Sequence, residues 1–288
     1  MKPLVAPISY LLISHGSRDP RPQEAMNRLA DLVRQRLEAS LLAGRKTSVE
    51  TASLVVDSEE AQANGQTIVL TRPRLKVRTE TPPAYGNVIV GTACLELSPI
   101  DLSQQIVEFG QRLVAAGVRE LRLLPVFLMA GVHVMEDLPV EVDKAKQLLG
   151  DSIELTLCPH LGGHPQMLKV LTERIAAVPA EGALLVAHGS RRPKGNRKIQ
   201  ALGQKLRTEV AYWATAPDIE EQVIGLMQKG AQRIAILPYF LFSGGITDAI
   251  TCRTEELAER FPKVKFRLLP TLGATEEMAD LAAEILLA

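Results

Sequence analysis

The chain has 288 residues, of which 46% are apolar, so it can bury one large core or two of ordinary size. Its 33 basic residues balance 33 acidic residues, and zero net charge gives no general attraction to nucleic acid or to an anionic membrane. Three widely spaced cysteines predict reduced thiols. Without a signal peptide or an apolar segment of membrane length, we expect a cytoplasmic protein.

Apolar runs and amphipathic stretches alternate along the chain. In the first half we expect strands at 8–14, 87–94, 120–128 and 153–157 and helices at 22–42, 101–116, 136–149 and 165–177. In the second half we expect strands at 183–187, 233–237 and 264–268 and helices at 194–209, 218–229, 247–260 and 275–287. Strands that alternate with helices are typical of a parallel sheet with helices on both faces.

The two halves repeat each other. The string His15-Gly16-Ser17, which ends the first predicted strand, returns as His188-Gly189-Ser190, and later landmarks keep a nearly constant offset. We therefore predict two similar lobes, residues 1–178 and 179–288. Only the first carries an insertion, at about 44–84. Its segments 53–56 and 67–77 favour a hairpin across the Asn64-Gly65 turn, and a mobile surface excursion is the alternative.

Three polar residues of the first half follow the ends of predicted strands: His15, Glu96 and His133. Because the carboxyl ends of parallel strands meet at one edge of a sheet, we expect these side chains to converge. Two imidazoles and a carboxylate suit a transiently held divalent transition metal, and they can also accept protons. A solvated Glu96 and a surface-loop His133 are the alternatives. In the second half, Ala214 and Ile246 stand opposite Glu96 and His133.

Further polar residues lie near the same strand ends. Basic side chains follow both His-Gly-Ser strings: Arg18, Arg21, Arg191, Arg192, Lys194 and Arg197. Beside helix N-termini they suit a ligand with several carboxylates, and an ordinary solvated helix face is the alternative. For His160 and His164 we expect local structural roles, with His164 capping the helix that follows it.

Several strings of the sequence together resemble one family, the class II chelatases, and specifically the long two-half sirohydrochlorin chelatases. These strings are the paired HGS strand ends, LEL-x-P with Glu96, PVFLMAGVHVMEDLP, LGGHP and LPYFLFSGGITD. The resemblance covers nearly the whole chain except the insertion. It implies an α/β fold of two Rossmann-like lobes, each a parallel sheet flanked by helices, that face each other across a cleft.

The resemblance also implies a reaction and a site. The reaction is insertion of Fe²⁺, or alternatively Co²⁺, into sirohydrochlorin in siroheme or cobalamin biosynthesis, with no nucleotide and no cofactor beyond the substrate metal. The family's metal and proton-handling residues map onto His15, Glu96 and His133, which we expect to be catalytic and metal-binding. The residues expected to contact the macrocycle are Gly16, Ser17, Arg18, Leu128, Met129, Val132, His188 and Arg191.

Two other functions stay open at this point: a tetrapyrrole or metal carrier without turnover, and a nickel chelatase of a related pathway. A nucleotide-binding protein is disfavoured because no G-x-G-x-x-G or P-loop string follows either opening strand. The expected partners are sirohydrochlorin and a divalent metal, with neither nucleic acid nor membrane. We expect a monomer, because the internal duplication mimics a dimer.

Overall fold

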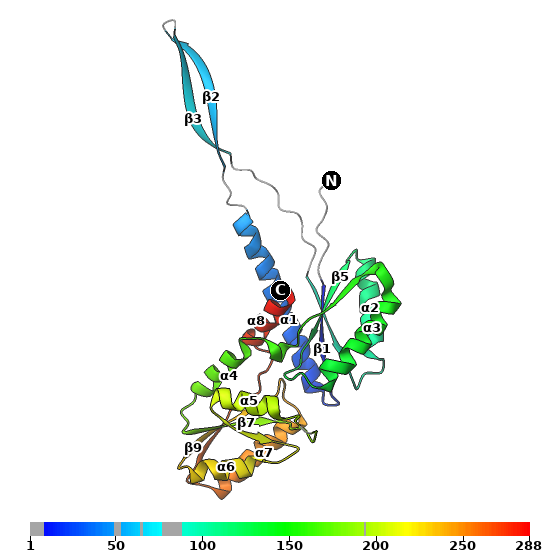
Figure 1. Ribbon diagram of the computed structural model, residues 1–288, viewed down its shortest axis with the longest axis vertical. Helices are drawn as coiled ribbons and strands as arrows, with labels where there is room; N and C mark the ends of the chain where they lie inside the picture. The colour runs from blue at the N-terminus through cyan, green and yellow to red at the C-terminus, as the bar shows by residue number, and fades with distance from the viewer. Residues whose placement is uncertain (1–8, 49–52, 64–65, 77–87, 193) are drawn as a thin grey trace.

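The computed structural model describes residues 9–48, 53–63, 66–76, 88–192 and 194–288, and it contains one four-stranded parallel sheet in each half of the chain (Figure 1). The first sheet has the spatial order β4 (Ile89–Cys94), β1 (Ser9–Ser14), β5 (Glu120–Pro125) and β6 (Glu154–Leu157). The second has the order β8 (Glu209–Tyr212), β7 (Gly182–Ala187), β9 (Arg233–Pro238) and β10 (Lys265–Leu268). The two orders are equivalent, which confirms the predicted duplication of an α/β lobe.

Within the described residues, each half also contributes four α-helices. Those of the first half are α1 (Pro20–Ser48), α2 (Leu102–Ala115), α3 (Leu138–Leu149) and α4 (Met167–Ala176). Those of the second half are α5 (Arg197–Leu206), α6 (Ile219–Gln228), α7 (Gly245–Arg260) and α8 (Glu276–Leu287). Short helical turns occupy His133–Asp137, Gly150–Ser152 and Leu161–Gly163. None of the described helices combines the length and apolar composition needed to cross a bilayer.

The outer face of each sheet packs on two helices of the same half. In the first sheet, Leu11 and Ile13 of β1 point outward, because alternate residues of a strand face opposite sides, and they join the core that α2 and α3 cover. In the second sheet, Leu184 and Val186 of β7 join the corresponding core under α6 and α7. This pattern explains why the strands read as continuous apolar runs, as expected when both faces of a parallel sheet are covered.

The inner faces of both sheets share a single core. Tyr10 and Leu12 of β1 belong to the same cluster of buried residues as Leu185 of β7. The helices of this core come from both halves, and their fully buried side chains include Leu29 on α1 and Leu286 on α8. The two lobes are therefore joined through an apolar interior as well as by the chain that links them.

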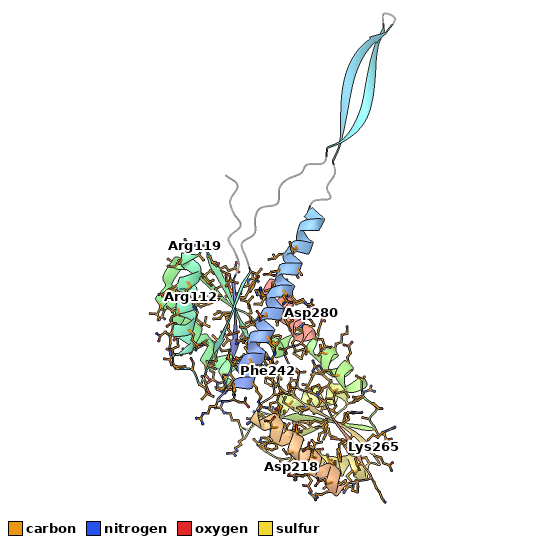
Figure 2. The ribbon with its side chains drawn as sticks, turned by 180° about the vertical axis from the view of Figure 1, so that it is seen from behind. Arg112, Arg119, Asp218, Phe242, Lys265 and Asp280 are labelled. Atoms are coloured by element: carbon orange, nitrogen blue, oxygen red, sulfur yellow. The ribbon has the colours of Figure 1, made fainter. Side chains whose placement is uncertain are left out.

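The last helix of each half packs on the other lobe. Helix α8 lies against α1 and β5, whereas α4 lies against α5 of the second lobe (Figure 1). Arg122 of β5 donates from Nη1 to the Leu286 carbonyl of α8 at 2.8 Å. Arg36 of α1 pairs with Glu276 and Asp280, and Figure 2 shows Asp280 beside α1. The division at residue 178 stays a prediction, because the last helix of each half packs on the lobe formed by the other half.

Two further predictions differ in detail from the structure. The helix expected to reach residue 209 ends at Leu206, because Arg207 adopts a left-handed conformation with φ of 55°, and the unpredicted strand β8 follows. In the insertion, β2 (Ser53–Ala63) and β3 (Gln66–Lys76) pair antiparallel, which confirms the predicted hairpin with a longer first strand. The predicted turn at residues 64–65 lies outside the described residues. The hairpin stands apart from both sheets (Figures 1 and 2).

An ion pair joins the two lobes beside the start of α1. The Arg21 guanidinium contacts Asp248 of α7 through two bonds, Nη2 to Oδ2 at 2.6 Å and Nη1 to Oδ1 at 3.1 Å, and it also binds Asp19. Its hydrogen bonds lower the pKa of both carboxyl groups. The pair is therefore present at neutral pH and weakens as acid protonates the two carboxylates. Arg21 is occupied in this way, which contradicts its predicted availability to a ligand.

Candidate functional site

His15 and Glu96 are held together by the backbone beyond β1 and β4. The Leu95 amide donates to the Ser14 carbonyl and the Glu96 amide to the His15 carbonyl, both at 2.9 Å, so the strand pairing continues one step into the site. Gly16 has φ of +99°, and a Cβ there would lie 2.0 Å from the Glu96 carbonyl oxygen. Only glycine fits at this position, because a side chain would push Glu96 away from His15.

His133 comes from the loop after β5 and begins a π-helical turn that continues into α3. The turn places Asp137 against the ring, with His133 Nδ1 2.8 Å from Asp137 Oδ2. A carboxylate accepts a hydrogen bond, so this contact fixes the proton on Nδ1 and leaves the lone pair of Nε2 free. Asp137 was not predicted from the sequence, although its spacing of four residues from His133 on a helical segment was a usable signal.

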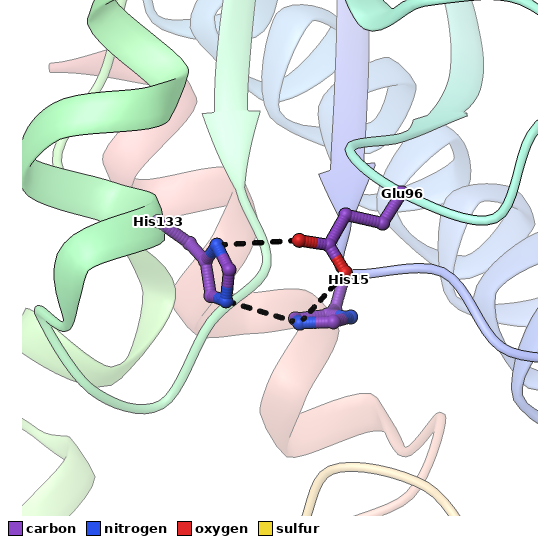
Figure 3. Close-up of side chains that lie close together, drawn as sticks. All are labelled: His15, Glu96 and His133. Carbon is purple, nitrogen blue, oxygen red and sulfur yellow. Dashed lines mark hydrogen bonds and ion pairs between the residues drawn. The ribbon is translucent and has the colours of Figure 1, made fainter.

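His15, Glu96 and His133 converge as predicted (Figure 3). The two Nε2 atoms of His15 and His133 are 3.3 Å apart. Glu96 lies between the two rings, with Oε2 3.7 Å from His15 Nε2 and Oε1 3.7 Å from His133 Nδ1. One ligand atom from each residue lies within 4.8 Å of the others. Two nitrogens bound tetrahedrally to one ion at about 2.0–2.1 Å would be about 3.3–3.4 Å apart. The imidazole pair is therefore spaced to share a metal ion.

The three side chains remain accessible. His15 is 46% exposed, Glu96 48% and His133 38%. A structural metal site is closed by four protein ligands, whereas a site that must receive and release an ion keeps open positions. Three half-exposed ligands with room for water or a further ligand can capture an ion and pass it on.

The cluster opens into a cleft of about 1050 Å³ between the lobes. His15 and His133 line it from the first lobe, and His188 lines it from the second. Of the residues predicted to contact a macrocycle, Leu128, Met129, Val132 and His188 line this cleft. Tyr239, which is buried and directly follows β9, also lines it. The wall is largely apolar apart from the ionisable groups at its rim, as in many small-molecule sites.

The other predicted contact residues lie elsewhere. Arg191 lines a second, adjoining cavity of about 590 Å³ in the second lobe. Gly16, Ser17 and Arg18 line neither of these two cavities within the described chain, and Ser17 instead accepts a hydrogen bond from the Asp19 amide at 3.0 Å. Arg197 lines neither cavity.

The second lobe reproduces the backbone of the site without its ligands. The Ala214 amide donates to the His188 carbonyl at 2.9 Å, which matches the bond from Glu96 to His15. Ala214 and Ile246 line the second cavity together with His188. The equivalences with Glu96 and His133 therefore hold in space, and His188 has an alanine and an isoleucine beside it in place of metal ligands.

His164 and His160 belong to the packing around α4. The His164 ring accepts a hydrogen bond at Nδ1 from the Gln166 amide at 3.2 Å, just before the helix, and its Nε2 lies 3.2 Å from Glu284 of α8. Burial and the charge of Lys198 lower the pKa of His160. The N-cap residue of α4 is Gln166, so His164 binds the backbone of the N-cap residue and is not itself the cap, and the structural role of His160 stays a prediction.

The comparisons with known proteins agree with this geometry. The model of the CbiX family matches residues 78–178 and 182–287, one segment in each half and well over half of the chain. The chain belongs to the CbiX family. The first segment of the match starts after His15 and includes both Glu96 and His133, and the second includes the whole described sheet of the second lobe.

Individual members and solved structures show weaker similarity. A sirohydrochlorin cobaltochelatase of Priestia megaterium is 23% identical over 215 residues, which cover 69% of this chain and 69% of that protein. A sirohydrochlorin ferrochelatase of the same organism is 23% identical over 177 residues, 57% of this chain and 66% of that protein. The structure of SirB from Bacillus subtilis with Fe³⁺ superposes with a TM-score of 0.61 and 18% identity, covering 97% and 94% of the two chains. That structural likeness supports the two-lobed fold.

Proposed function

We propose that this member of the CbiX family is a sirohydrochlorin chelatase, which inserts Fe²⁺ or Co²⁺ into sirohydrochlorin. The observation that carries the proposal is the convergence of His15, Glu96 and His133, because both imidazoles of this cluster line a cleft between the lobes. The activities named for its relatives, a cobaltochelatase and a ferrochelatase, support it. We also propose siroheme or cobalamin biosynthesis as its pathway.

The metal is a substrate that the site must first hold. His15 and His133 each offer Nε2, and Glu96 offers an oxygen as third ligand. Asp137 orients His133, because a ligand imidazole with its other nitrogen hydrogen-bonded keeps one tautomer and one direction. Nitrogen and oxygen ligands of this kind bind Fe²⁺, Co²⁺ and Ni²⁺, so the choice among them depends on metal supply as well as on the site.

Metal insertion releases protons. The divalent ion replaces two hydrogens on the inner nitrogens of the macrocycle, so two protons must leave and carry away the two positive charges that the ion brings in. Glu96 is the group that can change from metal ligand to proton acceptor, since its two oxygens lie 3.7 Å from the two imidazoles. The half-exposed site then passes the protons to solvent.

The macrocycle occupies the cleft with its flat centre against the apolar wall. Leu128, Met129 and Val132 line the cleft on the same side as His133. A ring packed there presents its inner nitrogens to the metal held by the two imidazoles. The shared apolar core keeps the walls of the cleft in register, because neither sheet can shift without disturbing buried contacts.

A single chain supplies both walls of the cleft, so we propose a monomer as the active species. The free cysteines Cys94, Cys158 and Cys252 fit the reducing cytoplasm that we propose as its location.

An anaerobic spectrophotometric assay tests the proposed activity. Sirohydrochlorin is mixed with the protein and with Fe²⁺, Co²⁺ or Ni²⁺ in parallel, and the change in its absorption spectrum is followed against a metal-only control. We expect catalysed insertion of Fe²⁺ or Co²⁺. Binding of the macrocycle without acceleration would identify a carrier instead, and acceleration confined to Ni²⁺ would identify a nickel chelatase.

Asp137→Asn should weaken Co²⁺ binding and metal insertion by about 10-fold to 100-fold, the usual effect of removing a hydrogen-bond partner of a ligand histidine. The amide can present its NH₂ to the ring, which favours the tautomer with Nε2 protonated and unable to bind metal. Equilibrium Co²⁺ titration measures the effect. Asp143→Asn removes the same charge from an exposed position on α3 and serves as the control. Equal Co²⁺ affinity in the two variants would remove Asp137 from the site.

A further inference from the structure

The two walls of the cleft carry opposite charges. The first lobe contributes Glu136 and Asp137 to the lining, beside the metal cluster. The second lobe contributes three cations: Arg192, Lys194 and Lys198. The acidic wall attracts a divalent metal, and the basic wall repels it and attracts anions.

The cations of the second lobe are free to bind a ligand. Arg192, Lys194 and Lys198 are exposed, and none of them forms an ion pair with the other described residues. Other arginines of this molecule are occupied, such as Arg21 with Asp248 and Arg174 with Glu277. Three unpaired cations beside an apolar surface match a ligand that combines a flat apolar centre with several peripheral carboxylates.

Lys198 lies where two cavities meet. It lines the main cleft and also a neighbouring cavity of about 480 Å³ between α4 and α5. The two cavities share Leu128, Met129 and Tyr239 as further lining residues. A ring centred on the apolar wall can therefore extend carboxylate arms past Lys198 on one side and toward Arg192 on the other. Arg192 in turn lines both the cleft and the cavity beside His188.

We propose that the duplicated lobes have divided the task. The second lobe binds the carboxylates of the macrocycle through Arg192, Lys194 and Lys198, and the first lobe handles the metal and the protons. This inference rests on the proposed function. The second lobe has Ala214 and Ile246 in place of metal ligands, and the inference gives it a role in binding the macrocycle. Its consequence is that macrocycle binding and metal binding can be lost separately.

The test measures macrocycle binding without turnover. Uroporphyrin, which is rich in carboxylates, and mesoporphyrin, which has few, are titrated with the full chain by porphyrin fluorescence, in parallel with sirohydrochlorin. For the double variant Arg192→Gln, Lys198→Gln we expect uroporphyrin and sirohydrochlorin affinity to fall at least about tenfold, since two charge-assisted contacts are lost. Mesoporphyrin affinity should change less than about threefold, and the loss for uroporphyrin should shrink at high salt.

Matched variants separate this role from a general effect. Arg197→Gln removes the same charge from the start of α5 outside the cleft and should bind like the unmodified chain. The charge-conserving double variant Arg192→Lys, Lys198→Arg should recover most of the affinity. Co²⁺ titration should give the same affinity for the Gln double variant as for the unmodified chain. In the insertion assay, that variant should show a raised KM for sirohydrochlorin and an unchanged KM for the metal.

Three results would each overturn the division of labour. The first is that the Gln double variant binds uroporphyrin and sirohydrochlorin with the affinity of the unmodified chain. The second is that the unmodified chain binds neither compound, and the third is that Glu96→Gln loses as much macrocycle affinity as the Gln double variant. If the insertion assay is negative but macrocycle binding still depends on the carboxylates, the chelatase activity is refuted and the role of the basic wall is retained. Failure of the proposed function can therefore be distinguished from failure of this inference.

Discussion

His15→Ala and His133→Ala should each reduce kcat/KM for metal insertion by at least about 100-fold, because each removes one of the two imidazoles that bind the ion. Mutation of a residue that only hydrogen-bonds a metal ligand already lowers metal affinity or activity by about 10-fold to 100-fold. Both rings lie at the ends of strands or in a loop and are about half exposed, so the fold should persist. The measurements are the anaerobic insertion assay and Co²⁺ titration, with far-UV circular dichroism and thermal unfolding as checks on the fold.

His188→Ala is the matched control, since the duplication places His188 at the equivalent strand end in the second lobe. Its neighbours Ala214 and Ile246 supply no metal ligand, so Co²⁺ affinity should be unchanged. Insertion should fall by less than about tenfold, through the loss of a contact that lines the cleft. Equal inactivity of His188→Ala and His15→Ala at equal thermal stability would show that metal passes through both lobes, and the assignment of a single metal site would be wrong.

The metal cluster could be predicted from the sequence because parallel strands impose a simple rule. Residues that directly follow neighbouring strands meet at one edge of the sheet, and His15 and Glu96 obey this rule through consecutive backbone hydrogen bonds. The repeat sharpened the prediction, since it identified Ala214 as the counterpart of Glu96, and the same hydrogen bond is present there. Local sequence and strand order were sufficient for this part of the site.

Contacts between segments distant in the chain could not be predicted in the same way. Arg21 was expected to face a ligand, but it binds Asp248, which lies 227 residues further along. Strand β8 has only four residues, and no glycine or proline separates it from the preceding helix. The sequence therefore showed neither a helix end nor an alternating apolar pattern long enough to predict a strand there. The orientation of His133 by Asp137 depends on a π-helical turn, which the expected regular helix from about residue 136 did not include.

The exchange of the last helices was equally invisible, because an amphipathic helix shows which face it buries and not which sheet covers that face. Apolar periodicity placed α8 correctly at 275–287, yet its partners α1 and β5 belong to the other half. This arrangement has a large consequence for stability. The first lobe is incomplete until the final residues of the chain are present.

Deleting residues 276–288 should therefore unfold the first lobe, although those residues belong to the second half of the sequence. The deletion uncovers Leu29 of α1 and Tyr10 of β1, which share a core with α8. A milder version is Leu286→Ala, which should lower the free energy of unfolding by about 2–5 kcal/mol, because this side chain is fully buried and leaves a cavity. Urea unfolding followed by far-UV circular dichroism measures the change.

The adjacent Leu287 offers a control with the same chemistry, since it is 44% exposed. Leu287→Ala should change the free energy of unfolding by no more than about 0.5 kcal/mol, as expected for an exposed position. For the isolated segment 1–178 we expect no cooperative unfolding transition, and addition of a peptide covering residues 271–288 should restore one. If segment 1–178 instead unfolds cooperatively without the peptide, and Leu286→Ala is as mild as Leu287→Ala, then α8 does not complete the first lobe and the boundary at residue 178 is a true domain boundary.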